Sequence, residues 1–272
     1  MATARQALRQ RRERQGLTQE SAAFELRIAV STYRSWERGE KTPRVGHRPK
    51  LARLLDVTLA EVDIYLDGQQ VAAPNGQQVP QWLTLHASLE QGASHIWAFH
   101  AFTVHALLQT ADYAAAVERA DAIPKSDDGI ARRVEMRLAR QGVIQREPDP
   151  VELSVILDES VLHRVTGGRE VMADQLTHLA TMAELPNIDV RILPLDAGQH
   201  SAAFGAFTMI ATPGATEPQI VCVEDRTGVR YLEGSHGVDA HQQVFEHLGR
   251  YALPPGESVD VIRSAGKERY QP

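Results

Sequence analysis

Cysteine is almost missing from this sequence of 272 residues, and aromatic residues make up only 6% of it. Because Cys222 stands alone, no internal disulfide can form, and a reducing compartment is the natural setting. The sequence also lacks an apolar run of the length that a membrane-spanning helix needs, and its N-terminus is polar and rich in arginine. We therefore expect a cytoplasmic protein with no signal peptide and no membrane association.

Short motifs typical of catalytic sites are missing as well. The sequence contains no HExxH, CxxC or GxSxG, and its glycines lack the GxGxxG spacing. His95, His100 and His105 recur every five residues, but this spacing turns successive side chains to different sides of a helix or strand. We therefore expect no metal site, no cofactor and no catalytic residue. An acid–base pair of His200 and Glu224 is the open alternative, beside the simpler interpretation of His200 as a hydrogen-bonded turn residue.

The length and the charge distribution indicate two domains. Apolar residues form 43% of the chain, enough for a sizeable core, and the formal net charge is −6. Residues 1–66 contain 13 Lys and Arg against 8 Asp and Glu, a net charge of +5, whereas the remainder contains 16 basic and 27 acidic residues, a net charge of −11. A small basic domain joined to a larger acidic one is typical of proteins that bind nucleic acid through one part only.

The segment Leu17–Pro43 predicts two short helices joined by a turn. Thr18 precedes an apolar pattern and can accept a hydrogen bond from a backbone amide two or three residues on, as a helix N-cap does. After a short break, Tyr33 and Trp36 stand three residues apart, on one face of a second helix. Gly39 follows the last apolar residue, where helices commonly end. This order predicts a helix-turn-helix.

Three further helices are expected around this segment. The first covers about residues 3–15, Pro49 opens another that ends near Leu55, and Thr58 caps the last, to Leu66. We therefore predict an all-α five-helix domain over residues 1–66. Residues 67–81 are rich in Gln, Gly and Pro without a period, and we interpret them as a linker.

Residues Ala4–Leu66 resemble the XRE-type, lambda-repressor-like helix-turn-helix family. Gln19, Trp36, Glu37 and Gly39 stand where the family pattern has them. Arg27 replaces the usual turn glycine, and Ala29 replaces the Ser or Thr that usually caps the recognition helix. The resemblance implies a recognition helix around residues 30–37 and a buried salt bridge between Arg12 and Glu37.

The recognition helix should divide its residues between base edges and phosphates. Its N-terminal residues enter the major groove first, so Val30, Ser31, Arg34 and Ser35 are the base-facing candidates. Tyr33 and Trp36 should pack the helix onto its domain. Phosphate contacts are expected from Gln19 at the start of the preceding helix and from Arg38, Lys41 and Arg44 beyond the recognition helix. The complete candidate DNA-binding set is Gln19, Val30, Ser31, Thr32, Arg34, Ser35, Arg38, Lys41 and Arg44.

Residues 82–272 predict a larger α+β domain. Strand-like runs alternate with amphipathic helical patterns, but without a strict βαβ order. The expected strands lie near residues 94–101, 151–158, 187–195, 204–212, 218–225 and 229–234. The expected helices lie near residues 82–93, 107–120, 127–147, 159–165, 169–185, 238–253 and 256–266.

This second half resembles the C-terminal domain of the WhiJ-like actinobacterial XRE regulators. The resemblance is carried by LLQTADYA, RRVEMRLARQ, ILDESVLHRVTGG, MADQLTHL and PNIDVRILPLDAGQH, and it spans about Ser88–Arg263. Members often have Val-Pro-Gly before LLQT, where this chain has Val104-His105-Ala106. The resemblance implies a regulator of development, antibiotic production or stress, usually encoded beside a small partner protein.

These observations together favour a sequence-specific, double-stranded-DNA-binding transcriptional regulator. Because one helix-turn-helix presents few base-reading side chains, we expect a homodimer. The second domain would sense a small-molecule effector or bind a partner protein. An antitoxin-like protein that mainly binds a small partner and regulates its own operon is one alternative. An enzyme fused to a DNA-binding domain, using His200 and Glu224, is the other.

Overall fold

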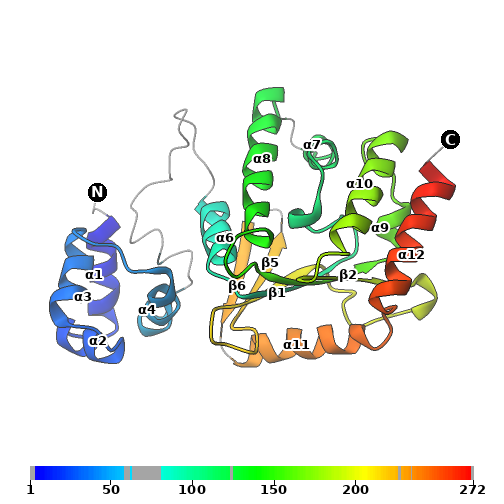
Figure 1. The fold of residues 1–272 in the computed structure, drawn as a ribbon. Helices are drawn as coiled ribbons and strands as arrows, with labels where there is room; N and C mark the ends of the chain where they lie inside the picture. The colour runs from blue at the N-terminus through cyan, green and yellow to red at the C-terminus, as the bar shows by residue number, and fades with distance from the viewer. Residues whose placement is uncertain are drawn as a thin grey trace. The chain divides into compact units, whose positions relative to one another are not determined.

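The computed structural model describes residues 4–57, 62, 81–122, 125–225, 228–233 and 235–270. The chain divides into two compact units, one of Met1–Gly92 with Thr227–Tyr231 and one of Ala93–Arg226 with Leu232–Pro272. The first unit begins with a helical region, and the second is built on a mixed sheet with helices, so the predicted succession of an all-α region and a larger α+β domain is confirmed (Figure 1).

The N-terminal region contains four helices within residues 4–57. They are α1 (Ala4–Arg14), α2 (Gln19–Glu25), α3 (Val30–Arg38) and α4 (Arg48–Leu55), with a short 3-10 turn at Val45–His47. The predicted fifth helix falls on residues 58–66, of which only the buried, helical Val62 is described. The predicted linker lies outside the described residues except for Gln81, which begins α6 (Gln81–Gln91).

The turn between α2 and α3 forms even though this sequence lacks the usual glycine and the usual cap of the second helix. The Thr18 hydroxyl accepts a hydrogen bond from the Ser21 amide at 3.0 Å and caps α2. Arg27 adopts a left-handed φ of +54°, the conformation for which the family uses glycine. Ala29 is the N-cap of α3 and supplies no side-chain hydrogen bond, and Gly39 ends α3 with a φ of +77°.

A small apolar core holds these helices together. The Tyr33 and Trp36 rings pack with their centroids 6.0 Å apart, and both side chains are buried. Burying one large apolar side chain stabilises a fold by about 1.5–3 kcal/mol, so this pair contributes strongly to fixing α3. The other buried apolar residues of α1, α2 and α4 are Leu8, Ala22, Ala23, Leu51, Ala52 and Leu55.

One six-stranded sheet organises the larger part of the chain. The strands are β1 (His95–His100), β2 (Glu152–Asp158), β3 (Ile188–Leu193), β4 (Phe207–Ala211), β5 (Ile220–Asp225) and β6 (Gly228–Glu233), in the order β3-β2-β1-β4-β5-β6. Strand β2 pairs in parallel with both β1 and β3, whereas β4 is antiparallel to β1 and to β5. Helices lie between the parallel strands along the chain, and a short connection joins the antiparallel strands β4 and β5.

Helices cover both faces of this sheet. Figure 1 shows α8 (Asp127–Arg140) and α10 (Arg169–Met182) on one face and α11 (Ser235–Gly249) on the opposite face. The remaining elements are η2 (Ala106–Leu108), α7 (Ala111–Arg119), η3 (Gln141–Ile144), α9 (Ser160–His163), η4 (Leu195–Ala197), α12 (Pro255–Ala265) and the π-helical turn η5 (Gly266–Tyr270).

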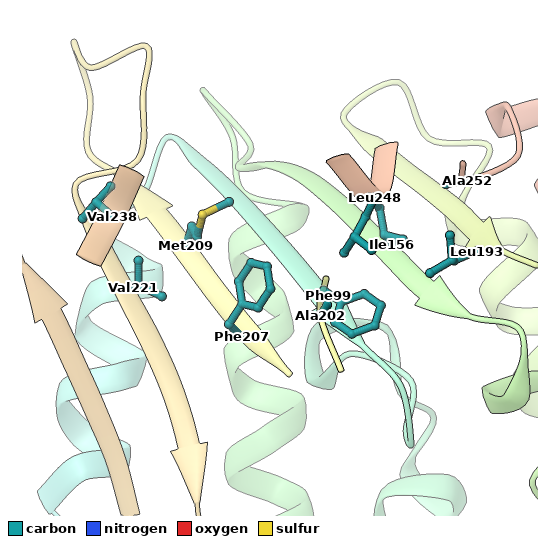
Figure 2. Close-up of a cluster of buried hydrophobic side chains, with 10 residues drawn as sticks. All are labelled: Phe99, Ile156, Leu193, Ala202, Phe207, Met209, Val221, Val238, Leu248 and Ala252. Atoms are coloured by element: carbon teal, nitrogen blue, oxygen red, sulfur yellow. The ribbon is translucent and has the colours of Figure 1, made fainter. Parts of the chain in front are cut away.

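The core beneath α11 is shown in Figure 2. Phe99, Ile156 and Leu193 lie on the adjacent strands β1, β2 and β3, and Val238 and Leu248 of α11 belong to the same buried cluster. Because side chains alternate along a strand, Ile96 and Ala98 of β1 are buried on the other face. Both faces of the central strand are therefore covered.

The buried side-chain amides of two glutamines hold the segment Leu107–Thr110, which begins the stretch LLQTADYA. Gln109 donates to the Val104 carbonyl at 2.7 Å, and Gln175 bonds both the Leu108 carbonyl and the Thr110 amide at 2.8 Å. His105 is the N-cap of η2, and its side chain accepts a hydrogen bond from the Leu107 amide at 3.3 Å. The turn thus forms without the Pro-Gly that members of the resembling group often have.

Candidate nucleic-acid interface

Helix α3 has one exposed face and one buried face. Ser31, Arg34 and Arg38 are exposed, at spacings of three and four residues that place them on one stripe. Val30 and Thr32 at the start of the helix are half-buried. Tyr33 and Trp36 point into the core. The helix can therefore present a short polar and basic edge while its other side anchors it.

A buried ion pair fixes α3 to α1. Arg12 Nε donates to Glu37 Oε1 at 2.7 Å and Arg12 Nη2 donates to Oε2 at 3.3 Å, while Nη1 donates to the Leu17 carbonyl at 2.6 Å. The side chains of Arg12 and Glu37 are 7% and 4% exposed. Burial alone would lower the pKa of Arg12, but the hydrogen bond and the charge of Glu37 outweigh it and raise that pKa. Both residues of the expected salt bridge thus meet in a desolvated site.

A second set of hydrogen bonds extends from this pair to the surface. Gln19 Nε2 donates to Glu37 Oε2 at 2.6 Å, and Gln19 Oε1 accepts from Arg34 Nε at 3.1 Å. Arg34 Nη2 donates to Glu20 Oε1 at 2.5 Å. The Gln19 side chain, which the sequence suggests as a phosphate contact, is therefore bonded at both ends within the protein. Glu20 is absent from the sequence-predicted set, because it lies 14 residues from Arg34 and no local pattern joins them.

Ser35 does not have the position that the sequence analysis expects. It is 5% exposed, and its hydroxyl donates to the Thr32 carbonyl at 2.7 Å. Ser35 stands one turn after the exposed Ser31, at the edge of the stripe, yet it is buried, so packing of α3 against the rest of the domain covers this edge of the helix. The expectation that Ser35 faces a base does not fit this geometry.

The basic residues at the C-terminal end of α3 and beyond it lie at the surface. Arg38 is held by Glu40 through two hydrogen bonds, Nε to Oε1 at 2.7 Å and Nη2 to Oε2 at 2.9 Å. The hydrogen bond from Arg38 lowers the pKa of Glu40, so its carboxylate is charged at neutral pH. Lys41 and Arg44 are exposed beyond the end of α3. Phosphates approaching this end of the helix would meet both cations.

The histidines of the second unit do not form the acid–base pair that was considered from the sequence. His200 Nε2 lies 3.6 Å from Asp158 Oδ2. Val221 and Val223 pack beneath α11, so alternation along β5 places Glu224 on the opposite face from that core, whereas His200 contacts Phe99 within it. The His100 and His105 rings do meet, 5.1 Å apart, because the chain turns after β1. Among the described residues, no group of three or more His, Cys, Asp or Glu could hold a metal ion.

One cluster of acid–base groups was missed by sequence reasoning. His95 Nε2 lies 2.9 Å from Ser154 Oγ, and His95 Nδ1 lies 3.1 Å from Glu152 Oε2. Burial lowers the pKa of His95, although Glu152 opposes this. Ser154 stands in the middle of β2, between two paired strands, whose amides are used in the sheet and offer no oxyanion site. These contacts therefore join the side chain of His95 on β1 to those of Glu152 and Ser154 on β2.

Two arginines of α8 form ion pairs within the second unit. Arg137 donates to Glu118 Oε1 at 2.6 Å and to Gln109 Oε1 at 2.8 Å, and Arg133 lies 3.8 Å from Glu118 Oε2. Burial lowers the pKa of Arg137, and Glu118 opposes that shift. This pairing favours internal ion pairs over a second nucleic-acid surface. None of the described helices is long and apolar enough to cross a membrane.

Two family models match the chain. Residues 8–62 match the helix-turn-helix family, which supports a DNA-binding role of the transcription-regulator type rather than an enzyme. No curated protein and no solved structure gave a match. Residues 83–264, more than half of the chain, match the domain of unknown function DUF5753. The chain combines an N-terminal XRE-type helix-turn-helix with this second domain, and it belongs to the DUF5753 family.

Proposed function

We propose that this protein is a sequence-specific transcriptional regulator that binds double-stranded DNA through α3. The observation that carries the proposal is the exposed stripe of Ser31, Arg34 and Arg38, opposite a face fixed by the buried Arg12–Glu37 pair. A rigid helix with a polar and basic edge suits the major groove, where base edges present donors and acceptors. Arg34 would pair with guanine, and Val30 would contact a thymine methyl.

Phosphate contacts in this proposal come from Lys41, Arg44 and Arg38. The net charge of +5 over residues 1–66 favours approach to DNA, whereas the −11 of the remainder disfavours it. We assign DNA binding to residues 1–66, a linker to 67–81, and effector or partner binding to 82–272. The protein would act in the cytoplasm as a homodimer, because one short helix reads too few base pairs for useful specificity. In this proposal the protein would be one of the WhiJ-like regulators that its second half resembles.

Selection from a random duplex library tests the proposal. The full-length protein should enrich one sequence, and footprinting on its own upstream region should protect a related site. Arg34→Ala should remove the preference for guanine at one position of the enriched sequence, whereas Arg250→Ala, an equal loss of charge at an exposed position of the second unit, should leave the enriched sequence unchanged. No enrichment by the wild-type protein, or enrichment unaffected by Arg34→Ala, would contradict it.

The antitoxin-like alternative is favoured by a different observation. Large apolar side chains are exposed on loops that follow the parallel strands, namely Phe102, Val165, Leu195 and Phe204. Exposed apolar groups of this size often mark contacts with another protein. Co-expression with the product of the neighbouring gene, followed by size-exclusion chromatography, should give a stable complex if partner binding is the main role.

A further inference from the structure

The guanidinium of Arg34 is held on one of its two hydrogen-bonding edges. Arginine offers a side-on edge, Nε with Nη2, and an end-on edge, Nη1 with Nη2. In this structure the side-on edge is occupied, since Nε bonds Gln19 Oε1 at 3.1 Å and Nη2 bonds Glu20 Oε1 at 2.5 Å. The end-on edge keeps two parallel N–H donors, the arrangement that matches O6 and N7 of guanine.

The two residues that occupy the side-on edge are themselves anchored. Gln19 Nε2 bonds Glu37 Oε2 at 2.6 Å, and Glu37 is buried against Arg12. The Glu20 carboxylate bonds its own backbone amide and Arg34, and both interactions lower its pKa despite some opposing desolvation. Glu20 is therefore an anion at neutral pH. A continuous series of hydrogen bonds runs from the buried ion pair to the exposed arginine.

We propose that Gln19 and Glu20 are positioning residues that orient Arg34 so that its end-on edge reads a guanine. This inference rests on the proposed function. A preordered side chain loses less conformational freedom on binding than a free one, so the cognate base is favoured. The Glu20 carboxylate also offsets the positive charge of Arg34, which weakens its attraction to phosphates of any sequence while leaving its directional donors in place.

A matched pair at the other end of α3 supplies the control. Glu40 holds the same edge of Arg38, Nε and Nη2, and the side chains are 58% and 55% exposed, against 47% and 60% for Arg34 and Glu20. Glu40→Ala and Glu20→Ala thus remove the same charge from equally exposed ion pairs of arginine. Only Glu20 is tied to the residue assigned to base reading.

The experiment measures the affinity of the full-length protein for two duplexes. One carries the selected site, and the other has the guanine read by Arg34 replaced by adenine, with its partner base changed to match. A bidentate arginine contact discriminates by about 1–3 kcal/mol, so the wild-type preference should be about 5- to 150-fold. Arg34→Ala should reduce this preference nearly to one.

Glu20→Ala should reduce the preference at least threefold while the affinity for the substituted duplex stays the same or rises. Glu20→Gln keeps an oxygen acceptor in the same place and should restore most of the preference, although it carries the same charge change. Glu40→Ala should tighten both duplexes equally and leave the preference unchanged. Thermal unfolding of each variant should match the wild type, because both carboxylates are exposed.

Two results would overturn the inference. If Glu20→Ala keeps the wild-type preference, whether or not it tightens both duplexes, Glu20 does not position Arg34. If Glu20→Ala and Glu40→Ala change the preference equally, the effect is one of charge alone. A wild-type protein that selects no sequence would instead overturn the proposed function, and this inference with it, so the two failures are distinguishable.

Discussion

The Arg12 guanidinium and the Glu37 carboxylate meet edge to edge between α1 and α3, with Nε 2.7 Å from Oε1 and both side chains nearly inaccessible to water. Their positions are separated by 25 residues, so the pair joins α1 to the end of α3. Its geometry also sets the position of Gln19, and through Gln19 that of Arg34.

Glu37→Ala should destabilise the first unit by about 3–5 kcal/mol, because Arg12 would be left as an uncompensated buried charge. Urea unfolding followed by circular dichroism measures this loss. The double variant Arg12→Met, Glu37→Leu should recover most of it, since apolar residues of similar volume often replace a buried ion pair without cost. A loss of less than 1 kcal/mol in the single variant would show that the pair contributes little.

Ala29→Ser should stabilise α3 by about 0.5–2 kcal/mol, because Ala29 is the N-cap and supplies no side-chain acceptor. The new hydroxyl can accept from the amide of Ser31 or Thr32. Thr18→Ala is the opposite change at the start of α2 and should cost a similar amount, since it removes the bond to the Ser21 amide. Equal urea midpoints for wild type and Ala29→Ser would mean that the serine does not cap.

The helices of the first unit could be predicted because their signals are local. Thr18, Gly39 and the spacing of Tyr33 and Trp36 act within one or two turns, and α2 begins directly after Thr18 and α3 ends directly before Gly39. The same reasoning placed Ser35 on the exposed face, although packing around α3 buries it. Which of two adjacent helix positions is covered depends on packing against other helices, which no short pattern records.

Contacts between distant segments could not be predicted from the sequence. The bond of Arg34 to Glu20 requires the angle between α2 and α3, and that of His95 to Ser154 requires the parallel register of β1 and β2. Similarly, His200 was considered beside Glu224, but the order of the strands places it near Asp158. Sheet order and register are set by the packing of the whole domain.

Asp189→Asn should stabilise the second unit at pH 7, because the amide is neutral whereas the carboxylate has to be ionised in a partly buried site. Asp189 Oδ1 is buried without a hydrogen bond, and burial raises the pKa of Asp189, although Arg191 opposes the shift. A raised pKa means that the folded state favours the neutral acid, so the stability linked to Asp189 is present below its unfolded pKa and lost as the pH rises through the folded value.

The advantage of Asp189→Asn should therefore shrink as the pH falls from 7 towards the unfolded pKa of an aspartate, about 4. Thermal unfolding of both proteins across this range measures it. Asp196→Asn, an equal charge change at an exposed position, should show no such trend. An advantage for Asp189→Asn that grows on acidification would contradict the assigned cause.

Lys41→Ala should weaken binding to every duplex about equally and reduce the slope of log K against log salt by about one unit. Lys41 is exposed beyond the C-terminal end of α3, past Ser31 and Arg34, so its charge would act on a phosphate rather than on a base. Removing one phosphate contact returns about one counterion to the DNA, and this loss does not depend on sequence.

Affinities for the selected and a scrambled duplex, measured over a series of salt concentrations, separate this behaviour from that of Arg34→Ala, which should weaken mainly the selected duplex. Arg250→Ala removes one positive charge from the second unit and should leave the slope unchanged. If Lys41→Ala lowers the affinity for the selected duplex alone, Lys41 contacts a base and the boundary between reading and phosphate contacts lies further along the chain than we propose.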